Sequence, residues 1–309
     1  IILCIIVLFM VGSEGYVLNG TVLLLIIPIF ILFFSTLTVL DYENRANCNS
    51  INSNNVMSTF KDVKDNIPII TRDVLNNTAY GVIEENMTII NSSEYVKAKV
   101  QERIDKLIHD CDVNCTIKTI TSYEGDPFYI EVNSTITVQK GNVKHAENIS
   151  QLVSVEGLPD PLPFTKCDSI SHNLTHIEYH HSLAAYLGGA NGSFYENATS
   201  PFIIRKCPYE PYEIHGSAPV IIDCIQNGYY HESNDGACYL CRLEGKATCP
   251  HQGLETFIIP HGLNNGSTIA SVDHVIFGDL YEGSPLIINS TTVYILFLDE
   301  AHRKKYGIK

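Results

Sequence analysis

The hydrophobic pattern opens with a long apolar segment, in which Thr21–Leu40 carries no charged residue. A helix of this length, at about 1.5 Å per residue, spans the roughly 30 Å hydrocarbon layer of a bilayer. Pro28 would break the interior of a soluble helix, but a spanning helix tolerates it. We therefore predict one transmembrane span at 21–40 within a hydrophobic N-terminal segment, 1–40; a buried core helix is the alternative.

The next segment, 41–158, has a helical pattern followed by strand patterns. Apolar residues recur every three or four positions from Val56 to Val74, which predicts a helix continuing out of the membrane and interrupted near Pro68. A second helix is expected at 93–110, where apolar residues repeat every four positions. Three alternating stretches separated by turn signals then predict an antiparallel meander, at 116–121, 128–139 and 149–155.

Pro159, Pro161 and Pro163 form a rigid break, which we take as the boundary between a helical stalk with its meander, 41–158, and a second lobe, 159–309. The second lobe is less regular. We expect two helices and three strands in it, the helices at 219–229 and 236–244 and the strands at 255–259, 274–277 and 292–298. The predicted fold class is α+β: an N-terminal transmembrane or pilin-like helix, extracellular helices with an antiparallel sheet, and an irregular Cys-rich α+β lobe.

The orientation of the span is indicated by glycosylation sequons. Asn-x-Ser/Thr accepts N-linked glycans only outside the cytoplasm. Besides Asn19 beside the span, it occurs at Asn76, Asn86, Asn91, Asn114, Asn133, Asn148, Asn173, Asn191, Asn197, Asn265 and Asn289. We therefore expect a single-span protein of the cell membrane with an extracellular C-terminal ectodomain.

Cysteine usage fits an oxidising exterior, because ten cysteines are many for an intracellular chain of 309 residues. Cys4 lies in apolar sequence. The other nine are disulfide candidates, and their odd number leaves one thiol free, intermolecular or metal-bound if the rest pair. They are Cys48, Cys111, Cys115, Cys167, Cys207, Cys224, Cys238, Cys241 and Cys249.

The densest candidate chemistry is Cys238-x-x-Cys241 followed by Cys249-Pro-His251. Three thiolates and one imidazole would complete a tetrahedral zinc site. Disulfides are the favoured interpretation in an exported protein, with Cys207 and Cys224 available as partners, and zinc and redox-active thiols are the alternatives. We therefore expect no cofactor, zinc being the one alternative.

Charge and motifs narrow the function classes. The chain has 34 acidic and 20 basic residues, a formal charge of −14, which disfavours nucleic-acid binding. The sequence contains no nucleophile elbow, Walker loop or dinucleotide fingerprint, and no acid, base and nucleophile lie close together along it. We therefore expect that the protein is not an enzyme.

Five stretches together resemble an uncharacterised archaeal family of membrane-anchored surface proteins, mostly from methanogens, of type IV pilin-like or pilus-associated character. The stretches are GYVLNGTVLLLIIPIFIL at 15–32, SVEGLPDPL at 154–162, NGYYHESNDGACYLCRLEGK at 227–246, GLETFI at 253–258 and LDEAHRKKYGI at 298–308. The resemblance implies an N-terminal helix that anchors the protein or packs in a filament core, with the head outside. Glu14 precedes Gly15 at the position where archaeal prepilins usually carry a basic residue. The resemblance therefore implies a minor or anchored pilin-like protein.

These observations favour a membrane-anchored structural or adhesion protein that self-assembles or contacts pilus and envelope proteins. Two alternatives remain open. One is an extracellular metal- or redox-dependent domain built on Cys238, Cys241, Cys249 and His251; the other is a surface or viral receptor-binding glycoprotein.

Overall fold

The computed structural model describes residues 16–108, 112–166, 173–178, 181–187, 195–260, 267–278, 282–288 and 293–309. Its contacts divide the chain into two compact units. The first comprises residues up to Thr59 together with Gln139–His145, and the second comprises Phe60–Val138 together with Ala146–Lys309. The candidate sites described below all lie in the second unit.

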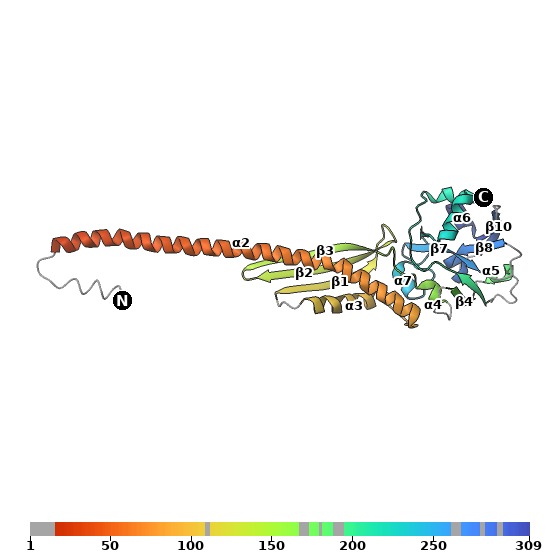
Figure 1. Cartoon of the computed structure of the whole chain (residues 1–309), viewed down its shortest axis with the longest axis horizontal. Coiled ribbons are helices and arrows are strands. Elements are labelled where there is room, and N and C mark those ends of the chain that lie inside the picture. Colours follow the sequence, from red (N-terminus) through yellow and green to blue (C-terminus); the bar gives the residue numbers. More distant parts are fainter. Residues whose placement is uncertain are drawn as a thin grey trace. The chain divides into compact units, whose positions relative to one another are not determined.

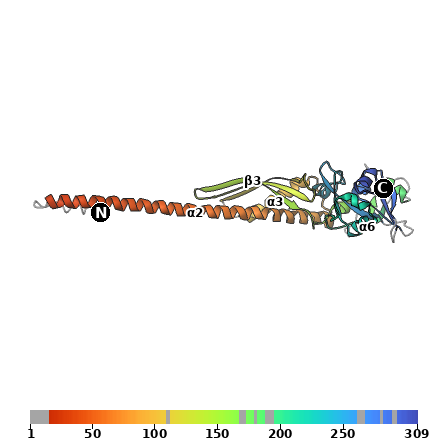
Figure 2. The ribbon, with the colours of Figure 1, turned by 90° about the horizontal axis from the view of Figure 1, so that it is seen from above.

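The N-terminal apolar helix is confirmed as part of α2 (Tyr16–Glu84), a single helix of 69 residues. It is unbroken in both views (Figures 1 and 2). Its apolar side chains between Ile27 and Leu40 are exposed, with Leu32 at 68% of its full accessibility. Among the described residues it is the one helix long and apolar enough to cross a membrane.

The predicted interruption near Pro68 is wrong, because α2 continues through it. Proline lacks the N–H that would pair with the carbonyl of Lys64 one turn earlier. The side chain of Gln151 donates its amide N–H to that carbonyl instead, at 3.0 Å. Buried neighbours such as Ile67 and Thr71 hold the helix on both sides of the proline. Tertiary contacts thus outweigh the local penalty.

The second helix and the meander are confirmed. Helix α3 (Ser92–Leu107) is capped by the side chain of Asn91, which accepts from the backbone N–H of Glu94, and it packs against β1. Strands β1 (Val113–Ser122), β2 (Tyr129–Lys140) and β3 (Val143–Ser154) form an antiparallel sheet in that order. Every second residue of β2 from Ile130 to Val138 is buried, as expected for a strand with one covered face.

The carboxyl-terminal region holds the second, mixed sheet. Its strands run in the order β4-β5-β7-β8-β10-β9, with β6 also paired to β7 and with β8 and β10 parallel to each other. Their bounds are β4 (Asn173–Glu178), β5 (Tyr195–Thr199), β6 (Tyr230–Ser233), β7 (Gly253–Pro260), β8 (Ser267–Val272), β9 (Ser284–Ile288) and β10 (Val293–Leu298). The labels in Figure 1 place β7 and β8 side by side among the short helices.

Short helices complete this region and carry much of the candidate chemistry. They are α4 (Leu162–Thr165), α5 (His181–Tyr186), η1 (Tyr212–Gly216), α6 (Ala218–Asn227), α7 (Tyr239–Leu243), α8 (Asp273–Phe277) and α9 (Glu300–Lys305). Two of the predicted helices correspond to α6 and α7, and two of the predicted strands to β7 and β10. The predicted strand at 274–277 is wrong: it is α8. Four apolar-polar positions are too few to separate a strand from a helical turn.

The core of the second sheet is apolar and shared between strands and helices. Phe257 on β7, Val272 on β8 and Leu296 on β10 are buried beside Ile221 of α6 and Val275 of α8. The Pro159–Pro163 stretch contributes to this region, because Asp160 within it is fully buried and paired with Arg242.

We predict that Ile67→Ala lowers the free energy of unfolding by about 2–5 kcal/mol, because it leaves a cavity at a fully buried position of α2. Ile69→Ala, two residues away at a position 66% exposed, is the matched control and is expected to change it by less than about 0.5 kcal/mol. Denaturant unfolding of the full chain in detergent measures both. Equal effects would contradict the described packing of α2.

Candidate metal centres

The four residues that the sequence analysis grouped are brought together by the fold. One ligand atom from each of Cys238, Cys241, Cys249 and His251 lies within 4.8 Å of each of the others. We call this group the CCCH centre. Cys238 and Cys241 are buried, Cys249 is half-buried and His251 is exposed, so the centre lies at the edge of the fold.

Local structure explains how the CCCH centre forms. Cys238 is the residue before α7 and Cys241 lies within it, so one helical turn presents both sulfurs to the same side. The turn lies close to the start of β7: a Cβ on Gly253 would come within 2.1 Å of the carbonyl oxygen of Gly236. Only glycine permits that approach, which brings Cys249 and His251, just before β7, against the turn.

Distances within the CCCH centre suit a shared cation. Nδ1 of His251 is 3.7 Å from the sulfur of Cys238 and 3.8 Å from that of Cys241. The backbone N–H of Cys238 donates to the sulfur of Cys249 at 3.2 Å. Hydrogen bonds from Cys238 and then Cys241 hold the pKa of Cys249 well below its ordinary value, so this sulfur is a thiolate.

A second group, which sequence reasoning missed, is fully buried. Cys207, His215, Cys224 and His231 also place one ligand atom each within 4.8 Å of the others, and we call them the CHCH centre. Cys207 precedes η1, His215 lies in η1, Cys224 in α6 and His231 on β6.

The CHCH centre has near-tetrahedral edges. The two sulfurs are 3.3 Å apart and the two Nε2 atoms 3.2 Å apart. Cys207 Sγ is 3.5 Å from Nε2 of His215, and Cys224 Sγ is 3.1 Å from Nε2 of His231. Zinc bonds of about 2.0–2.3 Å give tetrahedral edges of about 3.3–3.8 Å, so an ion fits after shifts of a few tenths of an ångström.

The surroundings of the CHCH centre also favour a metal. Nδ1 of His215 lies 2.8 Å from the carbonyl oxygen of Tyr212, which keeps the proton on Nδ1 and leaves Nε2 as the ligand atom. Hydrogen bonding to Cys224 outweighs burial and lowers the pKa of Cys207 to about 3, so this sulfur too is a thiolate. The ring of Tyr306 covers both histidines, with centroids 5.3 Å from His215 and 5.2 Å from His231.

No disulfide forms among the cysteines that the structure describes. The Cys207 and Cys224 sulfurs, which the sequence offered as bridge partners, are 3.3 Å apart, well beyond the 2.03–2.05 Å of a bond. Cys48 is exposed on α2, and burial on β1 raises the pKa of Cys115 to about 11. Cys111 and Cys167 lie outside the described residues.

The sequons are distributed over both sheets and α2. Among those with described side chains, four acceptors are exposed and two are half-buried; the exposed ones are Asn86, Asn91, Asn114 and Asn148, and the half-buried ones are Asn76 and Asn133. Asn173 and Asn197 lie on β4 and β5. Asn191, Asn265 and Asn289 lie outside the described residues.

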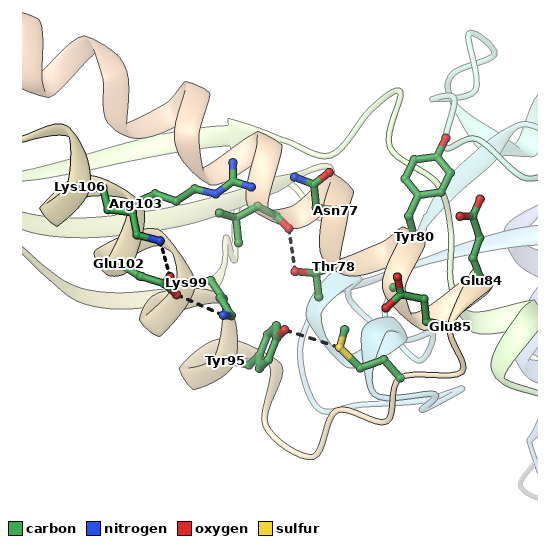
Figure 3. A pocket seen from close by; sticks show the side chains of 13 residues that line it. Asn77, Thr78, Tyr80, Glu84, Glu85, Tyr95, Lys99, Glu102, Arg103 and Lys106 are labelled. Carbon is green, nitrogen blue, oxygen red and sulfur yellow. Dashed lines mark hydrogen bonds and ion pairs between the residues drawn. The ribbon is translucent and has the colours of Figure 1, made fainter.

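A groove of about 570 Å³ lies between the end of α2 and α3 (Figure 3). Three of its charged side chains pair with one another: Glu102 pairs with Lys99 at 3.2 Å and with Lys106 at 2.7 Å. Both pairs are solvent-exposed, which makes each worth little energetically. The groove shows no buried reactive group and no gathering of metal-ligand side chains among its described lining residues.

No protein-family model, curated protein or solved structure matches the chain.

The sequence gives only a weak indication of the CHCH centre. Its ligands alternate Cys, His, Cys, His, with seven, eight and six residues between successive members. Standard zinc motifs place two ligands two to five residues apart, and this spacing does not. The alternation of ligand types was the available signal, and only the fold shows that the four converge.

We predict that Cys224→Ser removes one metal equivalent from the full chain. The expected loss in metal affinity exceeds the roughly 10–100-fold that follows when a residue that only orients a ligand is lost, because here a ligand itself is removed. Elemental analysis of detergent-purified protein measures the ratio of bound metal to protein. Cys48→Ser, at an exposed cysteine outside both centres, is the matched control and keeps the wild-type ratio. An unchanged ratio in Cys224→Ser would exclude the CHCH centre.

Proposed function

We propose that this chain is a membrane-anchored cell-surface protein of pilin-like type, with a structural or adhesive role and a head held together by zinc. The observation that carries the proposal is the character of α2. One continuous helix has exposed apolar side chains from Ile27 to Leu40 and a buried apolar face from Val56 to Ile83.

The exposed part of α2 requires an apolar environment. Fully burying a large aliphatic or aromatic side chain is worth about 1.5–3 kcal/mol, and this stretch exposes several, including Ile29, Leu32 and Phe34. Lipid or neighbouring helices in a filament core would cover them. The buried part of the same helix belongs to the folded core.

Two further features support a surface role. A long N-terminal apolar helix followed by a folded head is the arrangement that the pilin-like resemblance implies, and α2 with the sheets after it fits that arrangement. Exposed acceptors such as Asn86 and Asn148 are accessible to N-linked glycosylation outside the cytoplasm. Self-assembly or contact with pilus and envelope proteins is the expected partnership.

The two cysteine centres support a structural use of zinc. Each offers four protein ligands, which is the ligand number of structural zinc sites; catalytic sites keep one position for water. The CHCH centre is moreover closed to solvent. Metal binding contributes directly to folding in such domains. In this interpretation, metal binding stabilises the head and is not a separate function of the protein.

We predict that Leu32→Arg weakens membrane retention. An arginine near the centre of a spanning helix costs about 2.5–3.5 kcal/mol on insertion scales, so the fraction released by alkaline carbonate is expected to rise several-fold. Ile51→Arg, at another exposed apolar position of α2 beyond the apolar stretch, is the control and should behave as wild type.

Full release of the wild-type chain by carbonate would contradict the anchor. Protease protection of the head in intact cells would contradict its placement outside.

A further inference from the structure

A third convergent group lies in the second unit, and neither the anchor nor the cysteine centres use it. It consists of Asp235, Glu255, His274 and His302, with one ligand atom from each within 4.8 Å of the others. Asp235 lies between β6 and α7, Glu255 on β7, His274 on α8 and His302 on α9. Four separate segments therefore converge on one point.

The two histidines are oriented by carboxylates. Nδ1 of His274 lies 3.2 Å from Oδ1 of Asp273, and Nδ1 of His302 lies 2.7 Å from Oδ1 of Asp299. An ionised carboxylate can only accept, so each Nδ1 carries a proton, and Nε2 is the ring atom that faces the centre of the group. Carboxylate–histidine pairs of this kind orient metal ligands in many sites.

These Nε2 atoms face each other at 2.9 Å. Two nitrogens at this distance repel each other unless a proton or a metal ion lies between them. Tetrahedral metal–nitrogen bonds of about 2.0–2.1 Å give an edge of about 3.3 Å, which the rings reach by a small rotation.

Glu255 supplies an independent indication. Its side chain is fully buried, and its Oε2 has no hydrogen-bond partner. That oxygen lies 3.4 Å from Nε2 of His302 and 3.8 Å from Nε2 of His274. Oε1 of the same carboxylate is already used, since Lys305 donates to it at 2.8 Å and Tyr306 donates its hydroxyl. A buried carboxylate oxygen that faces two imidazole nitrogens is stabilised by positive charge there, which a protonated imidazole or a metal ion supplies.

The fourth member opens the group to solvent. The side chain of Asp235 is 40% exposed, and its Oδ1 lies 3.8 Å from Nε2 of His274. Asp235 and His302 both line a cavity of about 440 Å³, together with Tyr212 and Gln252. Three buried ligands with one exposed carboxylate leave a face of the group accessible, unlike the closed CHCH centre.

We propose that Asp235, Glu255, His274 and His302 bind one divalent first-row transition metal ion of the zinc class, with a fifth, exchangeable coordination position that faces this cavity. Two imidazoles with carboxylate oxygens are the ligand set of open zinc and non-haem iron sites. The position facing the cavity takes water or a small anionic ligand. This ion is distinct from those of the cysteine centres.

Cobalt binding to the metal-depleted full chain in detergent distinguishes the three centres. Cobalt at the CCCH and CHCH centres gives thiolate-to-metal charge-transfer bands, whereas cobalt at the proposed site gives none because its ligands are nitrogen and oxygen. We expect a third equivalent of cobalt to bind without increasing the thiolate-to-metal charge-transfer bands. Asp235→Asn is expected to weaken that equivalent by about tenfold or more while leaving the charge-transfer bands unchanged.

Gln252→Ala is the matched control, because Gln252 lines the same cavity but is outside the ligand group. It should bind the third equivalent as the wild type does. The proposal is overturned if binding saturates with thiolate centres alone, which would leave a shared proton between the two imidazoles. It is also overturned if Asp235→Asn binds the third equivalent normally. Loss of the thiolate bands with retention of the third equivalent would instead count against the zinc-held head.

Discussion

The CHCH centre buries two sulfur atoms and two imidazole nitrogens away from solvent. The fold must therefore supply favourable partners for these polar atoms. Burying polar or charged groups without partners costs several kcal/mol, and thiolates such as Cys207 cost more. A divalent cation would coordinate all four atoms at once and neutralise their charge. Because the ligands come from the segment before η1 and from η1, α6 and β6, such an ion would tie these segments together.

A buried ion-pair network connects the remaining centres. Arg242, on α7 beside the CCCH centre, pairs with Asp160 and with Asp273, and all three side chains are fully buried. Asp273 uses its other oxygen to orient His274 of the third group. The guanidinium of Arg242 thus holds both the α7 turn of the CCCH centre and the carboxylate of Asp273, which orients His274. Removing one partner from such a network typically costs about 3–5 kcal/mol, because it leaves a buried charge uncompensated.

Features with a local cause could be predicted from the sequence. The apolar stretch, α3 and the meander follow from periodicity and turn residues, and the CCCH centre follows from a short motif. Pro68 shows where local rules fail, since the donor that replaces its N–H is Gln151, far along the chain. The CHCH centre and the third group also depend on long-range topology. Glu255 and His302 come together only because β7 and α9 pack in one core.

Native mass spectrometry of the full chain, compared with its denatured mass without reductant, tests the zinc-held head most directly. We expect a native mass that includes one metal ion for each cysteine centre. The denatured mass should be metal-free with Cys207, Cys224, Cys238, Cys241 and Cys249 all as thiols. A metal-free native mass, with the denatured chain lighter by two hydrogens per bridge among these cysteines, would contradict the account.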